Sequence, residues 1–217
     1  TISQITSFDS DGFTVIKRSS GVNYVNASGN TYVGWSWKAG GAPTADNSAG
    51  AGATPTAGSV KIDGSNLGSA LAGTIAATKL SANTTSGFSV VEYPGNNTAG
   101  ATIAHGLSVT PEMIFVKQLD NGTSSWRVYD KTLGANQSIY LNLTEAASGA
   151  GNGHWNNTSP TATVFTVRDG DGVNSSSTNY VAYSFHSIEG YSKVGSYVGN
   201  ANADGPFIYT GFKPAFT

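Results

Sequence analysis

The chain has 217 residues, few charges and no cysteine, and these three features already exclude several classes of protein. Charged residues make up 11% of the chain against roughly 25% in an ordinary soluble domain, and the net charge of −2 predicts neither nucleic acid nor an anionic membrane as partner. The absence of cysteine excludes disulfide frameworks, thiol nucleophiles and cysteine metal sites. No apolar run of about 18 residues predicts a membrane span, and Thr1 does not begin a signal-peptide pattern.

Two segments near the N-terminus have the composition of strands. Gly12-Phe13-Thr14-Val15 is the first, and the second reads Thr31-Tyr32-Val33-Gly34-Trp35-Ser36-Trp37. In an extended strand alternate residues share a face, so Val33, Trp35 and Trp37 lie together and the small residues lie opposite. We expect the large face to pack on a thick core while another part of the molecule approaches the small face closely.

The next segment, from Gly40 to Ser86, is nearly all Gly, Ala, Ser, Thr and Asn and contains no aromatic residue. Such a segment cannot by itself bury enough apolar surface to offset the entropy of ordering it. We therefore predict a flexible linker for Gly40–Gly58. Recurring Val, Ile and Leu in Ser59–Leu80 predict a segment that becomes ordered against partner chains.

The remainder of the chain is strand-like and shows no helical periodicity. Glu112–Lys117 is a short apolar run that predicts a strand buried on both faces. Ser138–Leu143 alternates, which places Ile139, Leu141 and Leu143 on one face. Turn sequences rich in Asn, Asp, Gly and Pro separate such runs at intervals of roughly ten residues. The predicted fold class is all-β, with β-sandwich or jelly-roll-like units.

Parts of the chain repeat one another. The sequence Tyr-Val-small-aromatic-Ser-aromatic occurs at Tyr32–Trp37 and again at Tyr180–Phe185, and the residues before each copy also match: Gly12–Val15 with Val164–Val167, and Val25–Ser28 with Val173–Ser176. A weaker match joins Phe88–Asn96 to Tyr191–Asn200. The repeat predicts tandem units: 1–39 as the C-terminal part of one, 40–86 as a low-complexity linker, 87–190 as a complete unit and 191–217 as the start of another. This order predicts a fragment of a longer array or a unit completed by neighbouring chains, because an isolated edge strand exposes unpaired backbone groups.

Motifs for catalysis, cofactors and metals are weak. Phosphate-binding, dinucleotide-binding and nucleophile-elbow sequences are absent, and the three histidines are widely spaced. Glu92 and Glu112 could form a hydrolase pair only if they faced one another at about 5–10 Å. Asp169 and Asp171 form a weak calcium candidate that lacks further oxygen ligands. No catalytic residue and no cofactor is predicted.

Two clusters of aromatic and polar residues are the candidate ligand-binding residues. Carbohydrates are bound by exposed aromatic faces with planar polar groups beside them. Trp126 with Arg127, and His154 with Trp155 and Asn156, have that composition. The alternative interpretation is that Trp126 and Trp155 are core aromatics of the sandwich.

Several stretches of the sequence resemble virion proteins of marine bacteriophages and cyanophages, which often resemble tail fibres. The resemblance is carried by Gly41–Tyr93, His105–Leu107, Pro111–Lys117, Trp155–Thr158, Glu189–Tyr197 and Asp204–Pro214. Those proteins carry β domains in tandem, sometimes beside a concanavalin-A-like lectin domain. The resemblance implies an extracellular virion protein and brings no catalytic residues with it.

The leading functional hypothesis is a non-enzymatic structural and adhesive module of a phage tail fibre. It would attach to the host surface, a glycan being the expected receptor, and would associate with other virion proteins and with copies of itself as a homotrimer. The alternatives are a capsid or tail decoration protein without a receptor role, a bacterial extracellular adhesin or filament subunit, and a polysaccharide depolymerase.

Overall fold

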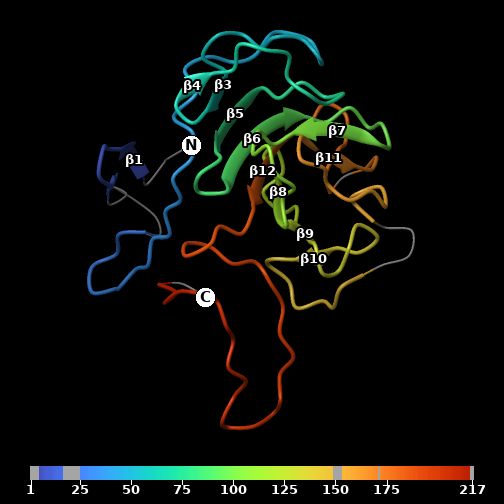
Figure 1. The fold of residues 1–217 in the computed structure, drawn as a ribbon. Helices are drawn as coiled ribbons and strands as arrows, with labels where there is room; N and C mark the ends of the chain where they lie inside the picture. The colour runs from blue at the N-terminus through green and yellow to red at the C-terminus, as the bar shows by residue number, and fades with distance from the viewer. Residues whose placement is uncertain (1–4, 17–24, 149–152, 171, 216–217) are drawn as a thin grey trace. The chain divides into compact units, whose positions relative to one another are not determined.

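The computed structural model describes residues 5–16, 25–148, 153–170 and 172–215. These residues form twelve β-strands and no helix (Figure 1), so the predicted all-β class is confirmed. None of the described residues forms a helix that is long and apolar enough to cross a membrane. The chain divides into two compact units, Thr1–Trp37 and Lys38–Thr217.

The first unit contains one hairpin. β1 (Ile5–Phe8) and β2 (Phe13–Val15) are antiparallel, with Phe8 opposite Phe13, and the backbone N–H of Asp9 donates to the carbonyl of Gly12 at 2.8 Å to close the turn. Thr31–Trp37, predicted as a strand, is not assigned to one, and its large side chains are exposed. The expected packing of its large face on a thick core is therefore not found in the described part of this unit.

The second unit is built on an eight-stranded sheet (Figure 1). Its strands, in spatial order, are β10 (Ile139–Tyr140), β9 (Arg127–Asp130), β8 (Met113–Gln118), β12 (Asn179–Phe185), β6 (Phe88–Pro94), β5 (Lys79–Asn83), β3 (Val60–Ile62) and β4 (Ser65–Asn66). Neighbouring strands are antiparallel except for β3 and β5, which are parallel. β12 lies at the centre and is paired on both sides over six or more residues, which fixes its register.

A second, smaller layer covers one face of this sheet and makes the unit β-sandwich-like. β7 (Ala101–Ala104) and β11 (Val164–Val167) form a two-stranded sheet whose Ile103 and Phe165 are fully buried. The ring of Phe165 meets that of Tyr93 edge-on at 6.1 Å, which joins the two layers. Burial of an apolar side chain of this size stabilises the fold by about 1.5–3 kcal/mol.

The face of the sheet that points into this core differs from the prediction. Tyr180, Ala182 and Ser184 of β12 are completely buried, whereas Tyr183 and Phe185 are partly exposed on the outer face. The small residues face the core because β7, β11 and the Trp155 loop fill the space above them. The outer face instead carries a cluster of aromatic rings.

The strands expected at Glu112–Lys117 and Ser138–Leu143 are present but differ from the prediction. β8 alternates, with Ile114 and Val116 buried and Phe115 partly exposed, rather than being buried on both faces. β10 contains only Ile139 and Tyr140, and both Leu141 and Leu143 are exposed. The chain leaves the sheet after Tyr140 because β10 is the last strand of that edge.

The low-complexity segment is ordered by the chain itself, so partner chains are not needed for Ser59–Leu80. β3, β4 and β5 extend the main sheet, and Val60, Leu71, Ile75 and Leu80 lie in its core. The part predicted as a linker is also held in place, because the Asn47 side chain accepts from the N–H of Ala49 and Thr56 and donates to the carbonyl of Ala77, all at 3.0 Å. Small residues permit this packing: a Cβ at Gly40 would lie 1.9 Å from the carbonyl oxygen of Ala82.

Candidate functional site

A polar cavity of about 480 Å³ opens beside the β9–β10 edge of the sheet. Separate parts of the chain meet there: the loop after β6, the strands β9 and β10, the segment that contains Ser148, the loop that begins at residue 153, and the turn after β11. The lining residues are Asn97, Arg127, Tyr140, Ser148, His154, Arg168, Asp169, Gly170 and Gly172. Its volume is in the range of small-molecule sites, which is roughly 300–1,000 Å³.

Arg127 is the central cation of this cavity. It opens β9 opposite Val116, so its side chain lies on the core side of the sheet. Its guanidinium Cζ lies 4.4 Å from the centroid of the Tyr140 ring, within the range of a cation–π contact. Its Nε and Nη1 are buried and have no hydrogen-bond partner among the described residues. Buried donors without acceptors are costly, so a ligand that supplies oxygen acceptors here would gain from them.

His154 is the second polar group and is neutral at physiological pH. Its Nδ1 lies 2.9 Å from the Ser138 hydroxyl, and its backbone carbonyl accepts from the N–H of Arg168 at 2.9 Å. Burial, followed by the positive charges of Arg127 and Arg168, lowers the pKa of His154 to about 4. The histidine therefore contributes a neutral hydrogen-bonding group.

Because His154 is neutral, the charged side chains of the lining, Arg127, Arg168 and Asp169, give the cavity a net positive charge. The Arg168 Nε lies 3.1 Å from the Asp169 carboxylate, and both side chains are about half exposed. The lining therefore contains two guanidinium groups and one carboxylate. A ligand with a carboxylate or sulfate group matches this balance, because planar guanidinium groups bind such anions through paired hydrogen bonds.

Two glycines shape the wall of the cavity. A Cβ at Gly172 would lie 2.7 Å from both the Arg127 Nε and the His154 Cδ2, so only glycine permits this approach. The N–H of Gly170 donates to the Asn97 side chain at 3.2 Å, and Gly170 has a positive φ of 109°. The turn after β11 is thus fitted closely against the two central side chains.

Comparison with known proteins identifies a family for the chain. The family model described as "Domain of unknown function (DUF7483)" matches residues 1–65 and 56–217. The chain belongs to the DUF7483 family. No curated protein and no solved structure matches this DUF7483 chain.

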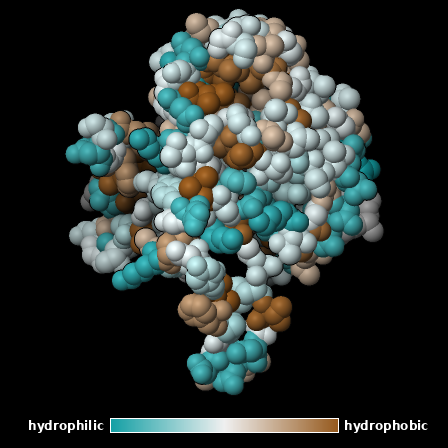
Figure 2. All heavy atoms as spheres, in the orientation of Figure 1, coloured by the Kyte–Doolittle hydropathy of each residue, from teal (hydrophilic) through white to brown (hydrophobic). Residues whose placement is uncertain are grey.

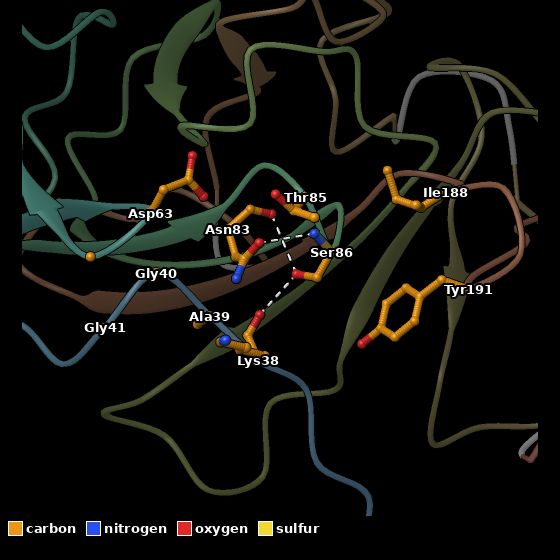
Figure 3. Close-up of a pocket in the computed structure, with 11 residues that line it drawn as sticks. Lys38, Ala39, Gly40, Gly41, Asp63, Asn83, Thr85, Ser86, Ile188 and Tyr191 are labelled. Carbon is orange, nitrogen blue, oxygen red and sulfur yellow. Dashed lines mark hydrogen bonds between the residues drawn. The ribbon is translucent and has the colours of Figure 1, made fainter.

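A larger hollow of about 750 Å³ lies elsewhere in the second unit of the DUF7483 chain (Figure 3). Several of its polar groups are engaged within the chain: the Ser86 hydroxyl donates to the carbonyl of Lys38 at 2.8 Å, and the Ser86 N–H donates to the Asn83 side chain at 2.9 Å. The Asp63 carboxylate accepts from the N–H and the hydroxyl of Thr84. Volume alone would favour this hollow. We prefer the smaller cavity because its buried donors lack partners.

The structure separates the residues that the sequence had grouped as ligand-binding. Arg127 and His154 meet in the cavity, but Trp126 lies on the opposite face of the sheet, where its ring stacks on Tyr183 at 6.0 Å. Trp155 is fully buried against Tyr129, so the core interpretation holds for it. Asn156 does not line the cavity.

Asn156 instead forms a turn, with a positive φ of 50° and its N–H donating to the carbonyl of Gly153. Asp169 lines the cavity beside Arg168, and Asp171 lies outside the described residues. In the described ranges no group of three or more His, Asp or Glu side chains could hold a metal ion. Sequence reasoning missed Asn97, Tyr140 and Arg168, because no local pattern links three positions that only the fold brings together.

The pairing of Glu92 with Glu112 as hydrolytic carboxylates is not supported. Glu92 lies opposite Val181 near one end of β12, whereas the N–H of Glu112 donates to the carbonyl of Phe185 at the other end. Met113 pairs with Phe185, so Glu112 is five residues along the strand and two strand spacings from Glu92, which places the two Cα atoms roughly 19 Å apart. That distance exceeds the separation of about 5–10 Å that glycoside hydrolysis requires.

The outer face of the sheet carries an aromatic cluster. Phe88 contacts Tyr183 and Phe185, Phe115 contacts Phe185, and Trp126 stacks on Tyr183. In the view of Figure 2, apolar side chains lie in separate small groups among hydrophilic ones. Burial, followed by the nearby carboxylate of Glu92, raises the pKa of the Tyr183 hydroxyl in this cluster. An anionic neighbour does not favour an acidic ligand, so the cluster ranks below the polar cavity as a site for such ligands.

Proposed function

We propose that this DUF7483 chain is an adhesive module of a phage virion appendage, such as a tail fibre, and that its polar cavity binds acidic glycans on the host surface. The observation that carries the binding role is the buried pair of unpartnered donors on Arg127, placed beside a second arginine and a neutral histidine. The resemblance of the sequence to virion proteins of marine phages supports the location.

The chemistry of the lining supports a sugar bearing a carboxylate or sulfate. Arg127, held over the Tyr140 ring, and Arg168 supply planar donors, and Asn97 and Ser148 supply neutral hydrogen-bonding groups. This combination suits a ligand that is both hydroxylated and anionic. A neutral sugar would leave the positive charge of the cavity unmatched.

Binding to a glycan array is the test. The chain should retain sulfated or carboxylated oligosaccharides and should bind the corresponding neutral backbones at least about tenfold more weakly, since a charge-assisted hydrogen bond contributes about 1.5–3 kcal/mol. Arg168→Gln, at a half-exposed position, should reduce acidic-glycan binding by a similar factor without unfolding the chain. Trp126→Ala, on the opposite face, is the matched control and should bind normally.

The opposite results would overturn the proposal. Equal binding of acidic and neutral backbones, or loss of binding in Trp126→Ala but not in Arg168→Gln, would exclude the cavity as the site. The proposed location has its own test, an image of the assembled particle. Antibody against the chain should label an external appendage of the virion rather than its capsid shell.

The earlier reason for a homotrimer no longer applies. Partner chains were expected to order Ser59–Leu80, but this segment packs against its own chain. Self-association therefore needs another basis.

A further inference from the structure

We propose that Ser138 is a positioning residue of the polar cavity: its hydroxyl donates to Nδ1 of the neutral His154 ring, which leaves the ring hydrogen on Nε2 and makes His154 a hydrogen-bond donor to the anionic group of the ligand. The ligand half of this inference rests on the proposed function, whereas the state of the ring is a property of the chain alone. Ser138 would thus set the selectivity of the cavity without touching the ligand.

Ser138 immediately precedes β10 and lies beside the cavity. Tyr140, two residues further on, lines the cavity and lies opposite Arg127, and strand alternation places Ser138 on the same face of the sheet. The backbone of Ser138 exchanges two hydrogen bonds of 3.1 Å with that of Ser148, which also lines the cavity. Only 1% of Ser138 is exposed. Its side chain is therefore enclosed by protein at the edge of the site.

The loop that carries His154 is fixed on both sides. The next residue, Trp155, is fully buried with its ring edge-on to that of Tyr129 at 5.7 Å, which anchors the loop on the sheet. The carbonyl of His154 accepts from the N–H of Arg168 at 2.9 Å, which joins the loop to the end of β11. The ring then lies with its Nδ1 2.9 Å from the Ser138 hydroxyl oxygen. Core packing and backbone bonds set this geometry, so it does not require a ligand.

The direction of the hydrogen bond between Ser138 and His154 follows from the groups available. Among the described residues, Nδ1 of His154 is the partner of the Ser138 hydroxyl. If Nδ1 carried the hydrogen, the serine oxygen would accept it, and the serine O–H would be buried without an acceptor, which is costly. If Ser138 donates, its hydrogen and the Nδ1 lone pair are both satisfied. This arrangement is therefore favoured, and in a neutral imidazole it leaves the hydrogen on Nε2.

Nε2 lies on the edge of the ring that faces the cavity. A Cβ at Gly172, a lining residue, would lie 2.7 Å from the His154 Cδ2 and 2.9 Å from its Nε2. The same Cβ would lie 2.7 Å from the Arg127 Nε, so the guanidinium and this ring edge lie against one wall. Nδ1 instead points to Ser138. The tautomer therefore decides whether the cavity side of the ring offers a hydrogen or a lone pair.

The ring carries a single N–H at neutral pH, so its two nitrogens have opposite roles. Burial, followed by the positive charges of Arg127 and Arg168, lowers the pKa of His154 to about 4. The two arginines can only donate hydrogen bonds, and a carboxylate or a sulfate ester can only accept them. Nε2–H therefore adds a bond to such a group, whereas a lone pair on Nε2 would repel it. A ligand hydroxyl can match either tautomer by rotation, so the selectivity that Ser138 confers is for the anionic group.

Nitrogen-15 NMR of the ligand-free wild type tests the tautomer, because protonated and unprotonated imidazole nitrogens resonate in separate ranges. The chain has three histidines, and His154→Gln identifies the resonances of His154. Between about pH 6.5 and 8, Nε2 should have the shift of a protonated nitrogen and Nδ1 that of an unprotonated one. In Ser138→Ala the ring loses its donor and exchanges between tautomers, so the two shifts should move towards each other.

Ser89→Ala is the matched control for the loss of a buried hydroxyl. Ser89 is also completely buried, but its hydroxyl has no hydrogen-bond partner among the described residues. The variant should leave both nitrogen shifts of His154 unchanged. A general effect of removing a serine from the core would appear in Ser89→Ala as well as in Ser138→Ala, whereas the proposed effect belongs to Ser138 alone.

Titration with inorganic sulfate at constant ionic strength tests the donor role. Sulfate should shift the His154 Nε2 resonance of the wild type, and Ser138→Ala should weaken sulfate binding by about threefold to tenfold, the effect of one weakened hydrogen bond. Ser89→Ala should bind sulfate as the wild type does.

The outcomes separate this proposal from the proposed function. A wild-type ring with its hydrogen on Nδ1 would overturn the role of Ser138 whatever the ligand. Equal sulfate affinities of the wild type and Ser138→Ala would also overturn it, and acidic-glycan binding at the cavity could still hold. If Nε2 carried the hydrogen but neither sulfate nor any acidic oligosaccharide bound, the proposed function would fail and the donor role of His154 with it.

Discussion

The guanidinium of Arg127 lies over the ring of Tyr140, with Cζ 4.4 Å from the ring centroid. A cation held on an aromatic face gains about 0.5–2 kcal/mol, more when it is shielded from water. The contact also aims the planar group along the cavity. We therefore expect Tyr140→Leu to lower the free energy of unfolding by about 1 kcal/mol and to weaken acidic-glycan binding, whereas Tyr140→Phe should preserve both.

Urea denaturation and glycan titration of the two variants measure these effects. A stability loss in Tyr140→Phe as large as that in Tyr140→Leu would show that the hydroxyl, and not the ring face, is the important group. If Tyr140→Leu kept the wild-type stability and glycan binding, Arg127 would not need the ring to keep its position.

Gly172 provides a second test of the cavity. An added methyl group would lie 2.7 Å from the Arg127 Nε and would displace it or close the cavity. Overpacking of this kind costs about 1–3 kcal/mol. Gly172→Ala should therefore lower the unfolding midpoint and reduce glycan binding at least about tenfold.

Gly122→Ala is the matched control, because a Cβ at Gly122 has no heavy atom within 4 Å. Its stability should stay within about 0.5 kcal/mol of the wild type. If Gly172→Ala bound the glycan as well as Gly122→Ala, the close approach of the turn to Arg127 would have no role in binding.

The fold class was predictable from the sequence because alternation and turn residues act locally. The pairing of distant segments was not. Trp126 and Arg127 are adjacent and seemed to form one site, yet strand alternation places them on opposite faces of the sheet. Ser59–Leu80 seemed too poor in large residues to be ordered within the chain, but the backbone of β5 pairs with β6 and places Leu80 in the core.

The candidate site could be only half predicted for the same reason. Arg127 and His154 attracted attention as polar residues beside tryptophans, and the fold brings them together. Arg168 enters the cavity because β11 pairs with β7, an association that local sequence patterns do not reveal. Tryptophan occurs both in sugar-binding sites and in cores, so its sequence position alone did not decide the role of Trp155. Its burial against Tyr129 shows that it packs in the core.

Two buried histidines predict a loss of stability at mildly acidic pH. Burial lowers the pKa of His105 to about 4, although a hydrogen bond to the carbonyl of Thr161 opposes this shift, and the pKa of His154 is also about 4. The unfolded chain takes up these protons near pH 6.5, whereas the folded chain resists them. Their stabilising contribution is therefore complete above pH 6.5 and is lost as the pH falls from 6.5 towards 4.

The expected loss is about 2 kcal/mol for each histidine by pH 5. The urea midpoint should fall as the pH is lowered from 7.5 to 4.5. In His154→Gln this decrease of the midpoint with pH should be smaller. His105 should be harder to replace, because its Nδ1 accepts from the N–H of Leu107 at 3.2 Å within a tight turn. A midpoint that does not change between pH 7.5 and 5 would contradict both assignments.

Glu112 links the sheet to the segment that follows β12, through Ser187 and Val194. Its carboxylate accepts from the N–H of Ser187 at 3.0 Å, from the Ser187 hydroxyl and from the Lys131 ammonium group. Burial alone would raise the pKa of Glu112, but the hydrogen bonds from Lys131 and Ser187 outweigh it and hold the pKa below its usual value. The Ser187 hydroxyl in turn accepts from the N–H of Val194 at 2.9 Å.

We expect Glu112→Gln to lower the free energy of unfolding by about 1.5–3 kcal/mol at pH 7, because hydrogen bonds to a charged group are lost. A lowered carboxyl pKa stabilises the fold above about pH 4.5, and the contribution is lost as the pH falls below that value. The difference between the variant and the wild type should therefore shrink at pH 3. Hydrogen exchange should also show faster opening at Val194 in the variant. If the difference in free energy of unfolding between the variant and the wild type were as large at pH 3 as at pH 7, the carboxylate charge would not be the source of the stabilisation.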